Sequence, residues 1–206
     1  MTTFSLAAEP APARLDSLLG SLRGTVLELG PGVGHSLRHY APDVRWIGVE
    51  PDPGHRERVR FEAARLGRRA HVVAGRAERL DLAGLEVAAS VDAVVATFVL
   101  CSVADQAAAL AEVFRVLRPG GRYVFAEHVA APAGTWARRA QHVRAALAGV
   151  TGRRCRPNRD SLPAIERAGF DVVELRTHTR AGPFGTGTPQ VAGVALRPAP
   201  TRGTPS

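Results

Sequence analysis

Near the start of the chain, two apolar segments lie on either side of a glycine-rich turn, and each segment carries a glutamate at or near its end. The first contains Glu28 and runs into Gly30-x-Gly32-x-Gly34, and the second ends at Glu50, twenty positions after Gly30. In a strand–helix–strand unit, glycines at such a turn let backbone amides approach a ligand where a Cβ atom would clash. An acidic residue at the end of the next strand accepts hydrogen bonds from ribose hydroxyls. The pattern therefore predicts a nucleoside-binding βαβ unit, with Glu50 on the ribose.

The spacing of the glycines argues against a dinucleotide. A dinucleotide-binding turn needs Gly-x-Gly-x-x-Gly, because its third glycine lets the helix pack closely while the pyrophosphate binds at the helix N-terminus. Counting from Gly30, that third position is His35. An NAD-dependent dehydrogenase is therefore disfavoured. A glycine-rich turn without any ligand is disfavoured by the glutamates on both sides.

Length and composition indicate one globular domain. A chain of 206 residues with 45% hydrophobic residues can bury one substantial core. Its apolar runs are far shorter than the roughly 18 to 20 residues of a membrane span, and its first residues lack the basic start and long apolar stretch of a secretion signal. We therefore expect a cytoplasmic protein, monomeric or homodimeric, that does not bind a membrane.

The charge and the cysteines exclude two further classes of site. The net charge of +8 comes from arginine alone, since the chain has no lysine, and the arginines are scattered without aromatic residues between them. A basic surface can bind nucleic acid by releasing counterions, but this pattern does not indicate such a surface. Cys101 and Cys155 lack the spacing of a metal site, so we expect reduced thiols and no bound metal.

Alternating strand and helix patterns predict the fold. Apolar runs typical of strands occur at residues 25–29, 44–49, 71–74, 91–98, 122–129, 170–175 and 191–196. Helical patterns occur at residues 15–22, 53–66, 105–117, 135–148 and 161–168, and a short helix is expected to end at Leu37. This alternation predicts an α/β fold, a doubly wound and mostly parallel sheet with helices on both faces.

One domain is expected to span residues 24–198. Residues 1–23 should form a helical extension that covers the site or the edge of the sheet. Residues 182–189 should form a flexible loop, and residues 199–206 a disordered tail. The helix at residues 105–117 has the clearest pattern in the chain. Asp105 should cap that helix, and the segment Arg118-Pro119-Gly120-Gly121 should end it.

The polar motifs follow the predicted strands. Ligands of open α/β sheets bind at the carboxyl ends of the strands, at the point where the strand order reverses. The motifs that lie there are residues 28–34, Glu50, Ala77-Glu78, residues 97–101 and Glu127-His128.

In combination, these motifs resemble the class I S-adenosylmethionine (SAM) methyltransferases. The turn at 28–34, Glu50, the Ala77-Glu78 pair and FRVLRPGG at 114–121 occur in family order, the last being common in small-molecule members of the ubiquinone/menaquinone type. TFVLCSV at 97–103 and EHVAAP at 127–132 are similar to the alkyl-thiol S-methyltransferases of the methyltransferase-like series. The resemblance covers most of the chain and implies a seven-stranded, Rossmann-like sheet with an antiparallel last strand.

The resemblance also implies SAM as cofactor and a role for each matching residue. The methionine moiety would be surrounded by Glu28, Gly30, Gly32 and Gly34. The ribose would be bound by Glu50, the adenine would be contacted by Pro51, Ala77 and Glu78, and the sulfonium would lie above Thr97. The sequence departs from the family in two places. Arg76 replaces an aspartate that many relatives have before the Ala-Glu pair. The hydrophobic N-terminal anchor of the thiol-methylating relatives is not expected here.

The expected reaction is methyl transfer to a small molecule, with a thiol as the favoured acceptor. Such a displacement depends mainly on alignment and on exclusion of water. A thiol with a pKa near 8.5 is already a few per cent thiolate at neutral pH, so a single modest base suffices. His128, at the end of the strand at 122–129, is the candidate catalytic base. The other interpretation is a histidine that only holds its loop in shape.

Other functions stay open at this point. The same glycine turn would serve an O- or N-methyltransferase of a small secondary metabolite, or a non-catalytic module that binds SAM. A nucleic-acid methyltransferase is disfavoured, because base amino-group methylation usually uses Asp/Asn-Pro-Pro-Tyr/Phe after the fourth strand, and this chain has Thr97-Phe98-Val99-Leu100 there.

Overall fold

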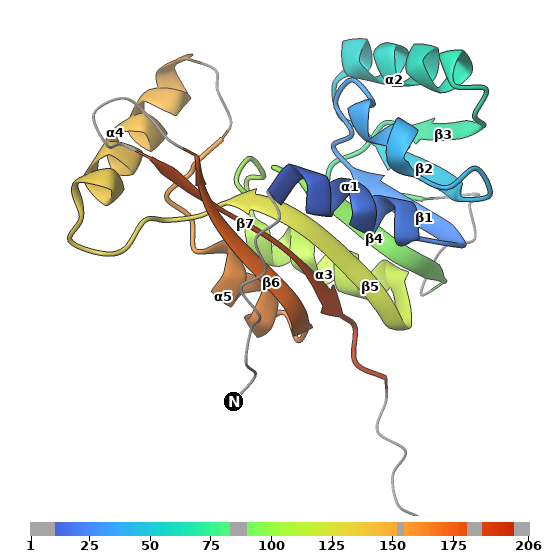
Figure 1. Ribbon diagram of the computed structural model, residues 1–206. Helices are drawn as coiled ribbons and strands as arrows, with labels where there is room; N and C mark the ends of the chain where they lie inside the picture. The colour runs from blue at the N-terminus through green and yellow to red at the C-terminus, as the bar shows by residue number, and fades with distance from the viewer. Residues whose placement is uncertain (1–10, 83–89, 152–154, 181–186, 200–206) are drawn as a thin grey trace, which may run out of the picture.

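One seven-stranded sheet forms the centre of the molecule (Figure 1). The computed structural model describes residues 11–82, 90–151, 155–180 and 187–199. The strands are β1 Thr25–Leu29, β2 Arg45–Val49, β3 Ala70–Val73, β4 Val91–Thr97, β5 Leu117–His128, β6 Asp171–Arg180 and β7 Thr188–Leu196. The helices are α1 Ala11–Ser21, α2 Pro53–Arg65, α3 Gln106–Val116, α4 Trp136–Thr151 and α5 Ser161–Arg167, with a 3-10 helix, η1, at His35–His39.

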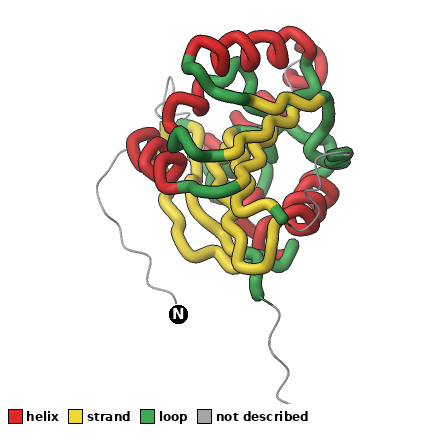
Figure 2. Tube along the Cα trace, turned by 90° about the vertical axis from the view of Figure 1, so that its right-hand side faces the viewer, coloured by secondary structure: helices red, strands yellow, loops and turns green. Residues whose placement is uncertain are grey.

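The strand order is β3-β2-β1-β4-β5-β7-β6. Strands β1 to β5 pair with one another in parallel, and β7 runs antiparallel to both β5 and β6. In Figure 2, which is turned by 90°, the strands lie between helices on both sides. The predicted doubly wound, mostly parallel sheet with an antiparallel last strand is therefore confirmed. Its order reverses between β1 and β4, which is where such sheets bind ligands.

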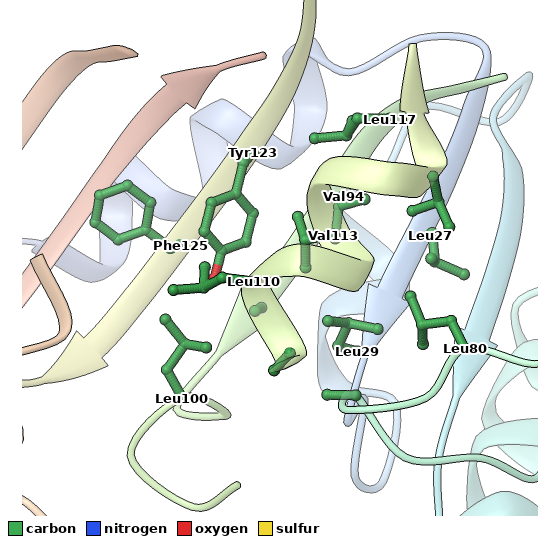
Figure 3. Packing of buried hydrophobic residues seen from close by; sticks show 14 of the residues in the cluster. Leu27, Leu29, Leu80, Val94, Leu100, Leu110, Val113, Leu117, Tyr123 and Phe125 are labelled. Atoms are coloured by element: carbon green, nitrogen blue, oxygen red, sulfur yellow. The ribbon is translucent and has the colours of Figure 1, made fainter. Parts of the chain in front are cut away.

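Each face of the sheet carries its own buried core. On one face, Leu110 and Val113 of α3 pack against Leu27, Val94 and Phe125 of the strands (Figure 3). On the other face, the cluster of buried residues includes Leu18, Leu19, Leu22, Leu37 and Trp46. Helix α1 thus packs on the sheet through its leucines. Residues 1–10 lie outside the described residues, so the prediction that the N-terminal extension covers the site stays a prediction.

The ends of α3 show one prediction that is confirmed and one that is wrong. Asp105 caps the helix, since its carboxylate accepts hydrogen bonds from the amides of Ala107 and Ala108. However, β5 begins at Leu117 rather than at the expected Arg122. The amide of Gly120 donates a hydrogen bond to the carbonyl of Arg197 at 2.8 Å. This backbone bond ties the Pro-Gly-Gly segment to the end of β7, so the segment belongs to the sheet.

The last two strands are longer than their apolar patterns. β6 continues to Arg180 and β7 starts at Thr188, inside the loop that was predicted at residues 182–189. The added residues pair across the two strands, for example His178 with Gln190. Because these residues are polar, hydrophobic periodicity did not indicate them. Residues 181–186, and residues 200–206 of the tail predicted at 199–206, lie outside the described residues.

Candidate functional site

A cavity of about 690 Å³ opens at the carboxyl ends of β1, β2 and β4. This is the point at which the strand order reverses, as the motif positions predicted. The residues that line it come from four successive loops: Gly30, Gly32, Val49, Glu50, Pro51, Asp52, Pro53, His55, Arg76, Ala77, Glu78, Phe98, Val99, Ser102 and Val103.

The glycine turn after β1 adopts a backbone that favours glycine. Gly30 and Gly32 both have φ of +57°, and Gly34, which precedes η1, has φ of +84°. The amide of Gly30 donates to the carbonyl of Val49 at 2.8 Å and so extends the β1–β2 pairing. A Cβ atom added to Gly32 would meet no protein atom within 4 Å. Gly32 therefore borders open space that a ligand can fill.

Gly32→Ala is expected to reduce ligand binding more than stability. The substitution strains a left-handed residue, at a cost of about 1–2 kcal/mol, and adds a methyl group at the cavity. Gly67→Ala is a matched control, because Gly67 also has positive φ (+65°) and open space at its Cβ, but it follows α2 outside the cavity lining. Calorimetric titration with SAM and thermal unfolding should show similar destabilisation in both variants and weaker binding in Gly32→Ala alone. Equal affinities would contradict the assignment of Gly32.

Glu50 lines the cavity and is 4% exposed. One carboxylate oxygen accepts a hydrogen bond from the amide of Gly32 at 3.1 Å, and the other accepts one from the amide of Asp52 at 3.0 Å. The imidazole of His55 is 3.7 Å from the second oxygen. These bonds fix the carboxylate beside the glycine turn. A buried acceptor at the end of β2, next to a turn that leaves room, fits the ribose of a nucleoside.

The adenine end of the predicted site is formed by the loop after β3. Ala77, Glu78 and Arg76 all line the cavity, and so does Pro51 from the loop after β2. Glu78 accepts a hydrogen bond from the amide of Ala104 at 2.7 Å and lies 3.4 Å from the Arg76 guanidinium. Burial alone would raise the pKa of Glu78, but the Ala104 amide and the guanidinium outweigh it, so the pKa is lowered. A carboxylate therefore faces the predicted adenine position.

Glu28 supports the glycine turn from the protein interior. One of its oxygens accepts hydrogen bonds from Ser36 (2.9 Å), Tyr40 (2.8 Å) and the indole of Trp46 (2.9 Å). Burial raises the pKa of this carboxyl, although the three donors act in the opposite direction. These three hydrogen bonds give Glu28 a structural role beneath the glycine turn. Its predicted contact with a methionine moiety stays a prediction.

The loop after β4 contributes residues of the predicted motif at 97–101 and two residues beyond it. Thr97, which was predicted to lie below the sulfonium, ends β4 and pairs with Ala126. The cavity wall is formed by the residues that follow it, Phe98, Val99, Ser102 and Val103. Phe98 has φ of +57°, which is rare for a residue other than glycine and occurs often at functional sites. The position of Thr97 relative to a sulfonium remains a prediction.

Glu127 holds this loop in place. Its carboxylate is completely buried and accepts hydrogen bonds from three successive amides, those of Val99 (2.9 Å), Leu100 (2.8 Å) and Cys101 (3.1 Å). Burial raises the pKa of Glu127, and the nearby Cys101 raises it further. The sequence analysis noted Glu127 only as a motif position. Its role depends on the side-by-side pairing of β4 and β5.

His128, the predicted catalytic base, lies next to the same loop. Its ring stacks on Phe98, with 4.5 Å between the centroids, and Phe98 lines the cavity. Its Nδ1 is 3.6 Å from the sulfur of Cys101 and 3.5 Å from the sulfur of Cys155. The two sulfurs are 3.4 Å apart, and both cysteines are free. Sequence spacing could not show this cluster, because its members are separated by 27 residues each.

Comparisons with known proteins agree with this geometry. Residues 27–125 match the methyltransferase domain family. Human thiol S-methyltransferase TMT1A is 36% identical over 157 residues, which are 74% of this chain and 62% of that protein. Rat thiol S-methyltransferase TMT1B is 34% identical over 81% of this chain and 70% of its own length. The chain thus spans about three fifths of the human relative.

The fold is also found in solved structures. A geranyl diphosphate methyltransferase in complex with GPP and sinefungin matches 90% of this chain and 77% of its own, with a TM-score of 0.69 and 16% sequence identity. That likeness shows the shared fold alone. Together with the sequence identity to TMT1A and TMT1B and the cavity at the strand-order reversal, it leads to one assignment. The chain belongs to the class I SAM-dependent methyltransferases, in the family that includes the thiol S-methyltransferases.

Proposed function

We propose that this protein is an enzyme that transfers a methyl group from SAM to a small-molecule thiol. The observation that carries the proposal is the buried Glu50 carboxylate beside an open glycine turn, in a chain about 35% identical to thiol S-methyltransferases. Among the described residues, no helix is long and apolar enough to cross a membrane. A cytoplasmic location, the monomeric or homodimeric state and the lack of a nucleic-acid partner remain parts of this proposal.

The residues of the cavity would hold SAM in three parts. Glu50 would accept hydrogen bonds from the ribose hydroxyls. The adenine would be bordered by Pro51, Ala77 and Glu78. The methionine moiety would be bordered by the glycine turn and Glu28. When bound, SAM supplies a methyl group on a positively charged sulfur, with a neutral thioether as leaving group. The protein's own contribution is to orient the acceptor and to keep water out.

The acceptor would approach from the loop after β4 and the end of β5. Phe98 and Val99 present apolar surface there, and both belong to the cavity lining. Such a wall suits an alkyl thiol, whose sulfur needs little activation compared with an alcohol. His128, whose ring stacks on Phe98, is the residue that the sequence predicts as the catalytic base. O- or N-methylation of a small metabolite and a non-catalytic SAM-binding module are the alternatives.

The proposal is tested by measuring S-adenosylhomocysteine formation with acceptors that differ in one atom. An alkyl thiol should be methylated at least about 100-fold faster than the alcohol of the same chain length, because the thiolate is far more accessible at neutral pH. An amine of that length completes the series. Preference for the alcohol or the amine would replace the thiol assignment. SAM binding without turnover of any acceptor would favour the non-catalytic module.

His128→Asn tests the predicted base separately. Removing a general base typically costs about 10²–10⁴-fold in rate. We expect a loss in that range in single-turnover methylation at neutral pH, and a smaller loss at higher pH, where more of the acceptor is already thiolate. SAM affinity should stay unchanged. A single-turnover rate equal to that of the parent protein would remove His128 from the mechanism.

A further inference from the structure

Three soft donor atoms from three distant segments meet beside the cavity. Cys101 follows β4, His128 ends β5, and Cys155 precedes α5. The two sulfurs and the imidazole Nδ1 all lie within 4.8 Å of one another, and nearest distances are 3.4 Å between the sulfurs and 3.5 and 3.6 Å from sulfur to nitrogen. Cys101 is buried, while the other two are half-buried. An ion could thus reach the cluster without crossing the core.

The distances match those required for a single four-coordinate ion. Zinc binds cysteine sulfur at about 2.3 Å and histidine nitrogen at about 2.0–2.1 Å, in tetrahedral geometry. Donors of one such ion are therefore about 3.8 Å apart for two sulfurs and about 3.5 Å apart for sulfur and nitrogen. The sulfur–nitrogen distances agree, and the sulfurs need to separate by only a few tenths of an ångström. A disulfide would need them at about 2.05 Å.

We propose that Cys101, His128 and Cys155 bind a thiophilic divalent cation, with zinc as the expected ion. Thiolate and imidazole donors select zinc over magnesium or calcium, which prefer oxygen. No metal was expected from the sequence, because Cys101 and Cys155 lack the spacing of a metal site along the chain. The fold brings together residues that the chain keeps apart.

Contacts with neighbouring residues fix the positions of the three donor residues, as is usual for metal ligands. The amide of Cys101 donates to Glu127 at 3.1 Å, and the carbonyl of Cys101 accepts from the amide of Arg156 at 2.6 Å. The imidazole of His128 stacks on Phe98. The segment that carries Cys155 is thus already tied to the loop that carries Cys101, so binding needs little rearrangement.

Three protein donors leave one position of a tetrahedral ion open. The cluster adjoins the cavity, because Phe98 and Ser102 line the cavity, and the hydroxyl of Ser102 is 3.6 Å from the sulfur of Cys101. The open position would take the acceptor, a step that rests on the proposed function. The thiol would exchange its S–H bond for a sulfur–metal bond and release its proton to solvent. Nδ1 of His128 would then be a ligand and no longer a base.

The ion itself is measured without any methyl transfer. The full chain, purified without chelator, should contain about one zinc per chain by elemental analysis, and its metal-free form should bind Co²⁺ with the thiolate charge-transfer and visible bands of a tetrahedral site. Cys155→Ser and His128→Gln should weaken Co²⁺ binding more than about 100-fold, since even outer partners of a metal site contribute about 10–100-fold. Thermal unfolding checks that the variants fold.

His142→Ala is the matched control, because His142 is an exposed histidine outside the cluster, and its Co²⁺ spectrum should equal that of the parent. The proposal is overturned by a metal-free chain that binds neither ion, by Co²⁺ bands that survive Cys155→Ser, or by an intact mass showing a Cys101–Cys155 disulfide in the purified protein. Adding an alkyl thiol without SAM should shift the bands, whereas the matching alcohol should not. If the Co²⁺ bands did not change on adding the thiol, only the proposed coordination of the acceptor would be refuted, whatever the result of the turnover assay.

Discussion

Glu50→Ala is expected to lower the affinity for SAM by at least about 100-fold. The carboxylate is 4% exposed and lies in the cavity, where it would accept hydrogen bonds from both ribose hydroxyls. A hydrogen bond to a charged group is worth about 1.5–3 kcal/mol, and about 1.4 kcal/mol corresponds to a tenfold change in affinity. In the parent protein the amide of Gly32 donates to Glu50 at 3.1 Å, and the variant removes that acceptor. The substitution therefore removes one carboxylate that both fixes the glycine turn and would bind the ribose.

Two further variants separate charge from shape. Glu50→Gln keeps the size of the side chain but leaves a single acceptor oxygen, so its affinity should lie between those of the parent and Glu50→Ala. Glu57→Gln removes an exposed carboxylate from α2 and should bind SAM like the parent. Calorimetric titration with SAM measures all three, alongside thermal unfolding. If Glu50→Ala bound SAM as tightly as the parent, the cofactor site proposed here would be wrong.

Glu127→Ala is expected to lower the free energy of unfolding by about 3–5 kcal/mol. The substitution leaves the amides of Val99, Leu100 and Cys101 without their acceptor in a buried place. Each unsatisfied buried donor costs about 1–3 kcal/mol, and relief of the buried charge recovers part of the total. The loop also holds Phe98 at positive φ, so the cavity wall should relax and SAM affinity should fall with stability.

Glu112→Ala is the comparison for this effect. Glu112 accepts from one backbone amide, that of Leu80, and pairs with Arg115 at the surface. Its loss should cost about 1 kcal/mol and leave SAM binding unchanged. Urea unfolding followed by circular dichroism gives both values. Equal destabilisation by the two variants would show that the three-amide anchor has no special weight.

The shared position of the glycine turn and Glu50 could be predicted from sequence because these parts are local. The glycine turn is contiguous, and Glu50 follows at the fixed length of one helical crossover. The structure places Gly30, Gly32 and Glu50 on the same cavity. Glu28 shows the limit of such reasoning, since its contacts with Tyr40 and Trp46 depend on how η1 and β2 pack.

The acceptor half depends on contacts between distant segments. Phe98 was predicted as the last residue of a strand, but it follows β4 with positive φ. Glu127 reaches the amides of this loop because β5 pairs with β4. Cys155 had no recognisable partner in the sequence. It meets Cys101 and His128 because the chain returns to the carboxyl edge of the sheet before α5.

By itself, the sequence determined the layered α/β fold and the place of the glycine turn and Glu50 at the carboxyl edge of the sheet, since hydrophobic periodicity and the glycine turn act over short stretches of chain. The tertiary structure decided which residues after β4 form the cavity wall, where Glu127 is anchored, and that three soft donors converge. Side-chain contacts between strands that are neighbours in the sheet but remote in the chain have no local pattern, so they become visible only once the strand order is known.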